Sequence, residues 1–227
     1  MPMQLDGPGF APLAGGKAAD LVVLLHGVAA NGNDLLYLAR AWRKVLPNVE
    51  FIAPNAPFPC DYAPEARQWF SLQDRAPEKL LAGLREAGAI LDRFFDELLA
   101  SRQLADARLA LAGFSQGAAT ALYAGLRRQT QIAGIVAFSG ALPEGVGLGR
   151  EIRSKPPVLL VHGVADDVVP FQSMANAKAA LEAAGVPVTA VARPGLGHGI
   201  DDAGIALAVD FLRDVLKAPQ HGSGLAV

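Results

Sequence analysis

Six short apolar runs recur along the chain, and each ends at a Gly, Pro, Asn or Ser residue. The first five lack strict alternation of apolar and polar side chains, which is typical of strands buried on both faces in a parallel sheet. We therefore predict strands over residues 21–27, 49–55, 108–115, 133–140, 157–163 and 186–195.

The segments between these runs place apolar side chains three or four residues apart, as on one face of a helix. The longest covers residues 77–101, where a broad apolar stripe runs from Leu80 to Leu98 and Pro77 suits the first turn. Shorter helices are expected over residues 33–46, 116–129, 172–184 and 202–217.

This alternation of strands and helices predicts an α/β fold with a mostly parallel sheet flanked by helices. Neither an internal repeat nor a linker divides the chain, so we expect a single domain over residues 1–218 and a flexible tail over 219–227. The link over residues 140–156 is too short to hold an inserted cap domain. Residues 53–76 form a long Pro-rich excursion, and loops of that length are usually functional.

Composition excludes several classes of protein. Hydrophobic residues make up 52% of the chain and charged residues 19%, which argues against disorder. The net charge is −2, and the absence of a Lys/Arg cluster gives no support to binding of nucleic acid or an anionic membrane. A single cysteine, Cys60, excludes an internal disulfide and a multi-cysteine metal site.

The start of the chain and its apolar runs indicate where the protein works. "MPMQLDGPGF" has no basic segment followed by an apolar one, so we expect no signal peptide. The longest apolar run, "LVVLL", is too short to span a membrane. We therefore expect a cytoplasmic protein without a membrane span, and its oligomeric state stays open.

A serine framed by two glycines stands where the third predicted strand meets a predicted helix. Gly113-Phe114-Ser115-Gln116-Gly117 fits the G-x-S-x-G nucleophile elbow, which holds a serine hydroxyl at a strained turn. Side chains at the two glycine positions would collide with neighbouring backbone in so sharp a bend. Ser115 is therefore the candidate nucleophile, and the dipole of the following helix faces the charge that develops during attack.

A serine nucleophile needs a histidine base, which follows the serine and an acid in the chain order of this fold class. His198 fits, because "RPGLGHGID" is a Gly-rich loop after the last predicted strand. His26 and His162 lie at strand ends, and neither follows a suitable acid downstream of Ser115. His221 falls in the tail.

The acid that orients the base should lie between the two, near the carboxyl end of a strand. Asp166 and Asp167, in "VHGVADDVVP", meet both conditions equally. Glu144, Glu151 and Glu182 fall in predicted loops or helices and are poorer candidates.

An oxyanion hole needs two backbone N–H donors, one from the residue after the nucleophile and one from the loop after the first parallel strand. Gln116 supplies the first. In "LHGVAANGNDL", Val28 is the candidate for the second, and Gly27 lets the backbone turn inward.

Substrate contacts are less clearly marked. Trp69, Phe70 and Phe171 lie near predicted strand ends and could line an apolar acyl groove together with Leu196, although each could instead cover the core. A metal site built on His198 and two nearby aspartates has no specific spacing, because Asp201 and Asp202 equally suit the start of a helix.

Six motifs in register, "LLHGVAANGNDL", "FIAPNAP", "RQWFSL", "LAGFSQGAATAL", "VHGVADDVVP" and "PGLGHGID", give the chain a family resemblance. From about residue 20 to 216 it resembles the phospholipase/carboxylesterase family of α/β-hydrolases, which includes the acyl-protein thioesterases. The resemblance implies an α/β-hydrolase fold and hydrolysis of esters or thioesters without a cofactor.

Carried onto this chain, the resemblance implies Ser115 as nucleophile, His198 as base and Asp166 as acid. It places the oxyanion donors on Val28 and Gln116. The chain departs from the family pattern at Ala29, where the family often has glycine, and at Asp167, where it often has proline.

We therefore expect a carboxylesterase for short to medium acyl chains, and an open site could also admit bulky or polymeric esters. An acyl-protein thioesterase or lysophospholipase would use the same residues. A non-catalytic binding protein on a hydrolase scaffold usually lacks one member of the triad, and all three candidates are present here.

Overall fold

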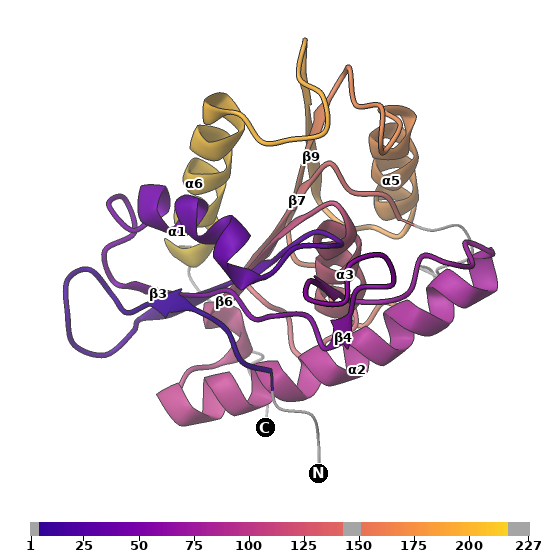
Figure 1. The fold of residues 1–227 in the computed structure, drawn as a ribbon. Helices are drawn as coiled ribbons and strands as arrows, with labels where there is room; N and C mark the ends of the chain where they lie inside the picture. The colour runs from indigo at the N-terminus through magenta and orange to yellow at the C-terminus, as the bar shows by residue number, and fades with distance from the viewer. Residues whose placement is uncertain (1–4, 143–150, 218–227) are drawn as a thin grey trace, which may run out of the picture.

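The computed structural model describes residues 5–142 and 151–217 and contains a central sheet ordered β1-β3-β2-β6-β7-β8-β9 (Figure 1). The pairings from β3 to β9 are all parallel, and β1 pairs antiparallel with β3 at one edge. The strands are β1 (Gly9–Phe10), β2 (Asp20–Leu25), β3 (Val49–Ile52), β6 (Leu109–Phe114), β7 (Gly134–Phe138), β8 (Val158–Gly163) and β9 (Val188–Arg193). The predicted mostly parallel sheet is confirmed, and β1 was not foreseen.

Helices cover both faces of this sheet (Figure 1). They are η1 (Gly32–Leu35), α1 (Leu36–Trp42), α2 (Pro77–Arg102), η2 (Asp106–Arg108), α3 (Gln116–Gly125), α5 (Gln172–Ala183) and α6 (Asp202–Lys217). Helices α2, α3 and α5 pack on one face, and α1 and α6 pack on the other. The expected α/β architecture is therefore present.

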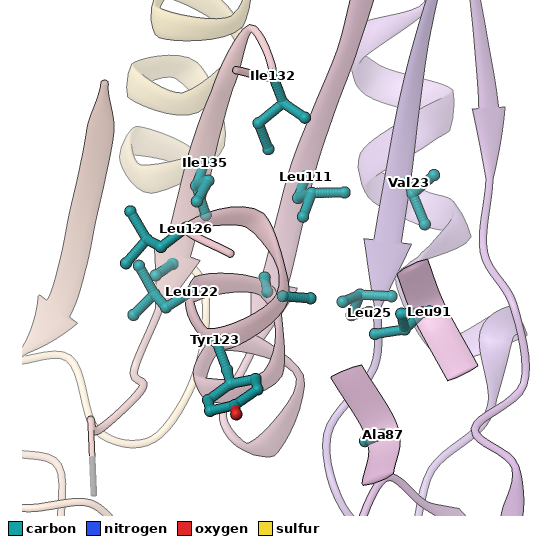
Figure 2. Packing of buried hydrophobic residues seen from close by; sticks show 14 of the residues in the cluster. Val23, Leu25, Ala87, Leu91, Leu111, Leu122, Tyr123, Leu126, Ile132 and Ile135 are labelled. Atoms are coloured by element: carbon teal, nitrogen blue, oxygen red, sulfur yellow. The ribbon is translucent and has the colours of Figure 1, made fainter. Parts of the chain in front are cut away.

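The two hydrophobic clusters divide successive residues of each buried strand. Val23 and Leu25 of β2 point to the face that α2 and α3 cover, whereas Val22 and Leu24 point to the face of α1 and α6. Figure 2 shows the first cluster, with Leu122 and other side chains of α3 lying against β6 and β7. Both faces of the central strands are buried, which explains why their sequences do not alternate.

The helix predicted over residues 33–46 is shorter than expected. Asn31 and Asp34 form a capping box that opens a 3-10 turn, and the α-helical part ends at Trp42. The N–H groups of Val45 and Leu46 both return to the Trp42 carbonyl, and Pro47 then stops the chain from continuing as a helix.

The Pro-rich excursion contains a small hairpin that the sequence did not reveal. Strands β4 (Phe58–Pro59) and β5 (Arg67–Gln68) pair antiparallel, and a further bridge joins Arg67 to Ala30. Each strand has only two residues, too few to leave a periodic pattern. The hairpin brings residues 67–70 beside the carboxyl end of β2.

Part of the link over residues 140–156 and all of the tail over 219–227 lie outside the described residues, as do Glu144 and His221. Within residues 5–142 and 151–217, no helix is both long enough and apolar enough to cross a membrane.

Candidate active site

Ser115 stands between β6 and α3 in a backbone conformation that non-glycine residues rarely adopt, with φ 54° and ψ −117°. Its N–H donates to the Phe138 carbonyl at 2.9 Å, which ties the turn to β7. A Cβ on Gly113 would lie 2.3 Å from the Gly117 carbonyl oxygen, and one on Gly117 would lie 1.9 Å from the Leu25 carbonyl oxygen. Both glycines are therefore required by close backbone contacts.

Hydrogen bonds connect Ser115, His198 and Asp166 in a line. His198 Nε2 lies 3.0 Å from Ser115 Oγ, and His198 Nδ1 lies 2.8 Å from Asp166 Oδ2. Because a carboxylate only accepts, Nδ1 carries the proton and leaves the Nε2 lone pair facing the serine hydroxyl. The three residues come from the ends of β6, β8 and β9, and they meet at the carboxyl edge of the sheet.

The geometry distinguishes the two neighbouring aspartates. The Asp166 side chain is fully buried, and its Oδ1 accepts the N–H groups of Val168 at 3.0 Å and Val169 at 2.8 Å. Burial opposes ionisation, but the hydrogen bonds from His198, Val169 and Val168 outweigh it and hold the pKa of Asp166 below its usual value. Asp167 is exposed to solvent.

A second imidazole, that of His162, lies beside the Asp166 carboxylate. His162 Nε2 is 3.2 Å from Asp166 Oδ2 and 2.9 Å from the Val169 carbonyl oxygen. Both of these atoms are acceptors, so Nε2 of His162 carries a proton and donates it. From the sequence, His162 was considered only as a base, although its position four residues before Asp166 is visible in "VHGVADDVVP".

Two backbone N–H groups remain free beside Ser115. Within residues 5–142 and 151–217, the N–H groups of Val28 and Gln116 have no protein acceptor. Gln116 is the first residue of α3, so its N–H has no intrahelical partner. Val28, Ser115 and Gln116 line the same cavity.

The side chain of Gln116 connects the elbow to the excursion. It is buried, its Oε1 accepts the Trp69 N–H at 2.8 Å, and its Nε2 donates to the Phe70 carbonyl at 2.7 Å. From the sequence, Gln116 was assigned only a backbone role, and these two side-chain hydrogen bonds were not predicted.

The loop that carries Val28 is held from both sides. Ala29 adopts φ 58°, its N–H donates to the Arg67 carbonyl at 3.0 Å, and the Arg67 N–H returns to the Ala30 carbonyl at 2.9 Å. Alanine therefore occupies a left-handed conformation at the position where the family often has glycine.

His26 supports this loop from below. Its Nδ1–H donates to the Gly27 carbonyl at 2.7 Å, and its Nε2 accepts the Ala56 N–H at 2.9 Å. One nitrogen donates and the other accepts, so this imidazole is neutral. Burial is the main cause that lowers the pKa of His26 below its ordinary value.

A cavity of about 280 Å³ opens beside Ser115 and is mostly apolar. It is lined by Val28, Phe70, Leu72, Arg75, Leu80, Ser115, Gln116, Ala119, Ala141, Val168 and Val169. A larger hollow of about 570 Å³ lies next to it and shares Phe70, but Ser115 does not line that hollow. The smaller cavity is the one that faces the hydroxyl.

Of the four predicted pocket residues, Phe70 lines this cavity, and Trp69, Phe171 and Leu196 are not among its lining residues. Trp69 is fully buried, and its Nε1–H donates to the His26 carbonyl at 2.9 Å, so it supports the loop instead. Phe171 packs edge-on against His162 with ring centroids 6.1 Å apart. Leu196 accepts the Ala165 N–H through its carbonyl and belongs to the turn beside β8.

The alternative metal site at His198, Asp201 and Asp202 does not form. Asp201 instead pairs with Arg193 at 2.8 Å and accepts the Gly204 N–H at 2.8 Å, which caps the start of α6. Among the described residues, no group of three His, Cys, Asp or Glu side chains could hold a metal ion.

Known proteins of similar sequence and fold include acyl-protein thioesterases and esterases. The phospholipase/carboxylesterase family matches residues 13–216. Acyl-protein thioesterase 1 of Neurospora crassa is 27% identical over 86% of this chain and 86% of its own, and esterase YpfH of Escherichia coli is 28% identical over 90% and 85%. The crystal structure of esterase PE8 is 41% identical, with a TM-score of 0.89 over 94% of this chain and 100% of that one.

The matched region includes Ser115, His198 and Asp166 and every described strand except β1. The chain therefore belongs to the phospholipase/carboxylesterase family of α/β-hydrolases, which are serine hydrolases that act on ester bonds.

Proposed function

We propose that this carboxylesterase works through Ser115 as nucleophile, His198 as general base and Asp166 as the acid that orients it. The observation that carries the proposal is the pair of hydrogen bonds that links the Ser115 hydroxyl to the buried Asp166 carboxylate through His198. His198 removes the hydroxyl proton as Ser115 attacks the ester carbonyl, and Asp166 stabilises the imidazolium that forms.

The N–H groups of Val28 and Gln116 are the proposed donors to the oxyanion of the tetrahedral intermediate. Both are free and border the cavity that contains Ser115. His198 then protonates the leaving alcohol, and water repeats the sequence on the acyl-enzyme. Each donor of this kind contributes about 3 kcal/mol to lowering the barrier.

The cavity supports short to medium acyl chains as substrates. Its volume of about 280 Å³ is near the lower end of the range for small-molecule sites. We also propose that bulky or polymeric esters are hydrolysed when their scissile bond can reach Ser115 from solvent. The proposed steps use only groups of the chain itself, without a cofactor, and we assign the enzyme to the cytoplasm.

A dedicated acyl-protein thioesterase is the second candidate, and the relatives that carry this name favour it. The ratio of activity on long-chain thioesters to activity on simple esters separates the two. A non-catalytic binding role is disfavoured, because His198 lies within hydrogen-bond distance of both Ser115 and Asp166.

Labelling with a fluorophosphonate probe tests the proposal, followed by an ester panel of increasing acyl length. Wild-type protein should be labelled at Ser115, and Ser115→Ala should lose both the label and the esterase activity. Full esterase activity in Ser115→Ala would refute the assignment. Asp166→Asn should lose far more activity than Asp167→Asn, and the reverse order would show the acid to be wrong.

A further inference from the structure

The cavity beside Ser115 contains one charged side chain. Arg75 lines it, and none of its other described lining residues carries a charge. Leu72 and Leu80 flank Arg75 in the sequence and also line the cavity, so the guanidinium stands next to an apolar surface. The lining thus combines an apolar surface with one positive charge.

Within residues 5–142 and 151–217, Arg75 has no acidic partner. The adjacent acid, Asp74, accepts the Ala76 N–H at 3.0 Å and lines the neighbouring hollow. Asp61 accepts the Ser71 hydroxyl at 2.7 Å and the Leu72 N–H at 3.2 Å. Other arginines of the chain, such as Arg102, do pair with carboxylates.

A guanidinium matches a carboxylate well because its N–H groups donate two parallel hydrogen bonds to the two oxygens. A lone arginine offers one such pair of donors, which matches the two oxygens of a single carboxylate. The expected ligand group is therefore a single carboxylate, separated by an apolar stretch from the bond at Ser115.

We propose that Arg75 binds a free carboxylate of the substrate, so that the enzyme prefers esters carrying a negative charge, such as half-esters of dicarboxylic acids. This inference rests on the proposed function, because it concerns the same cavity and the same nucleophile. Hydrolysis of a half-ester breaks one ester C–O bond and consumes one water. It releases the alcohol, a dicarboxylate and one proton.

Two matched substrates test the inference. Monomethyl adipate and methyl hexanoate have the same chain length and differ in a terminal carboxylate against a terminal methyl group. Wild-type enzyme should show a higher kcat/KM for the half-ester, and 0.5 M salt should reduce the preference, because the guanidinium is exposed to solvent. A second pair of substrates, with the carboxylate on the alcohol side of the ester, distinguishes whether Arg75 binds the acyl half or the alcohol half.

Arg75→Gln should lower kcat/KM for the half-ester about tenfold, as expected for loss of a charge-assisted hydrogen bond at a partly solvated site. It should change kcat/KM for the neutral ester much less, so that the ratio of the two values falls. Arg75→Glu should reduce the half-ester further, and Arg75→Lys should retain part of the preference because it keeps the charge but not the paired geometry.

Lys79→Gln is the matched control. It removes the same charge four residues away, but Lys79 lines the neighbouring hollow instead. The control should keep the wild-type preference. A wild-type enzyme that favours the neutral ester, or an Arg75→Gln variant with an unchanged ratio, would overturn the inference.

Failure of this inference is separable from failure of the proposed function. If the neutral ester is hydrolysed and Ser115 is labelled, but substitution of Arg75 does not change the ratio of kcat/KM for the half-ester to that for the neutral ester, only the role of Arg75 is wrong. If neither ester is hydrolysed and Ser115 resists the probe, the proposed function itself is wrong.

Discussion

His162 Nε2 lies 3.2 Å from Asp166 Oδ2, and the same oxygen accepts from His198 at 2.8 Å. Two backbone N–H groups donate to Oδ1, so three hydrogen bonds and the neighbouring His162 ring surround this carboxylate. They fix its orientation and moderate how strongly its charge acts on His198. His162 is thus placed to adjust the proposed base through the acid.

His162→Leu should lower kcat about tenfold with little change in KM, since the polar N–H group beside the acid is lost. His162→Gln, which retains an N–H donor, should recover part of kcat. A kcat that stays at the wild-type level, or a KM that rises as much as kcat falls, would contradict a positioning role for His162.

Gly117→Ala should destabilise the protein by roughly 3 kcal/mol or more, because its Cβ would lie 1.9 Å from the Leu25 carbonyl oxygen and backbone must move. Gly125→Ala, in the same helix, is the control. Its Cβ would meet the Ile135 side chain at 2.7 Å, and the flexible end of that side chain can shift. Urea unfolding of both variants checks the order, and equal losses would contradict it.

Ala29→Gly should raise the free energy of unfolding by roughly 0.5–1 kcal/mol, since glycine adopts positive φ without the steric cost that Ala29 bears at φ 58°. The gain is partly offset by the greater entropy of glycine in the unfolded chain. Denaturant titration measures the change. A destabilised variant would mean that the alanine methyl group packs favourably in the oxyanion loop.

His26 should make the protein less stable as the pH falls below about 6.5, the ordinary value for histidine. Burial lowers the pKa of His26 in the folded state, so the unfolded chain binds this proton first. The contribution of neutral His26 to the free energy of unfolding is therefore fully present above the pKa that His26 has in the unfolded chain. It is lost as the pH falls toward the lower pKa of the folded protein, with a slope of at most about 1.4 kcal/mol per pH unit.

Thermal unfolding of wild type and His26→Gln between pH 8 and pH 5 checks this sign. Glutamine offers both a donor and an acceptor but does not titrate, so the variant should lose less stability than wild type across this range. Parallel curves for the two proteins would exclude His26 as the source.

The sheet and the turn that carries Ser115 could be predicted because they depend on local patterns. Apolar runs located the parallel strands, and the two glycines around Ser115 predicted close backbone contacts. The structure places these contacts at the Gly117 carbonyl for Gly113 and at the Leu25 carbonyl for Gly117. Residue order alone could not separate Asp166 from Asp167. That distinction depends on which carboxylate the Val168 and Val169 N–H groups face within one turn.

The cavity lining could not be predicted, because it depends on which way each loop side chain points. Trp69 and Phe70 are adjacent, yet one supports the loop from inside and the other faces the cavity. Their different roles follow from the hairpin of β4 and β5, whose two-residue strands are too short to read from periodicity.

Residues 67–70 contact both halves of the proposed oxyanion hole. Arg67 binds the Ala29 N–H next to Val28, and the backbone of Trp69 and Phe70 binds the side chain of Gln116. The spacing between two donors from different strands thus depends on one short segment outside the central sheet. Gln68, Trp69 and Phe70 of this segment are buried, and the two aromatic side chains belong to the core, so the segment cannot open without disrupting that core. Heat should therefore inactivate the enzyme in the same transition that unfolds its core.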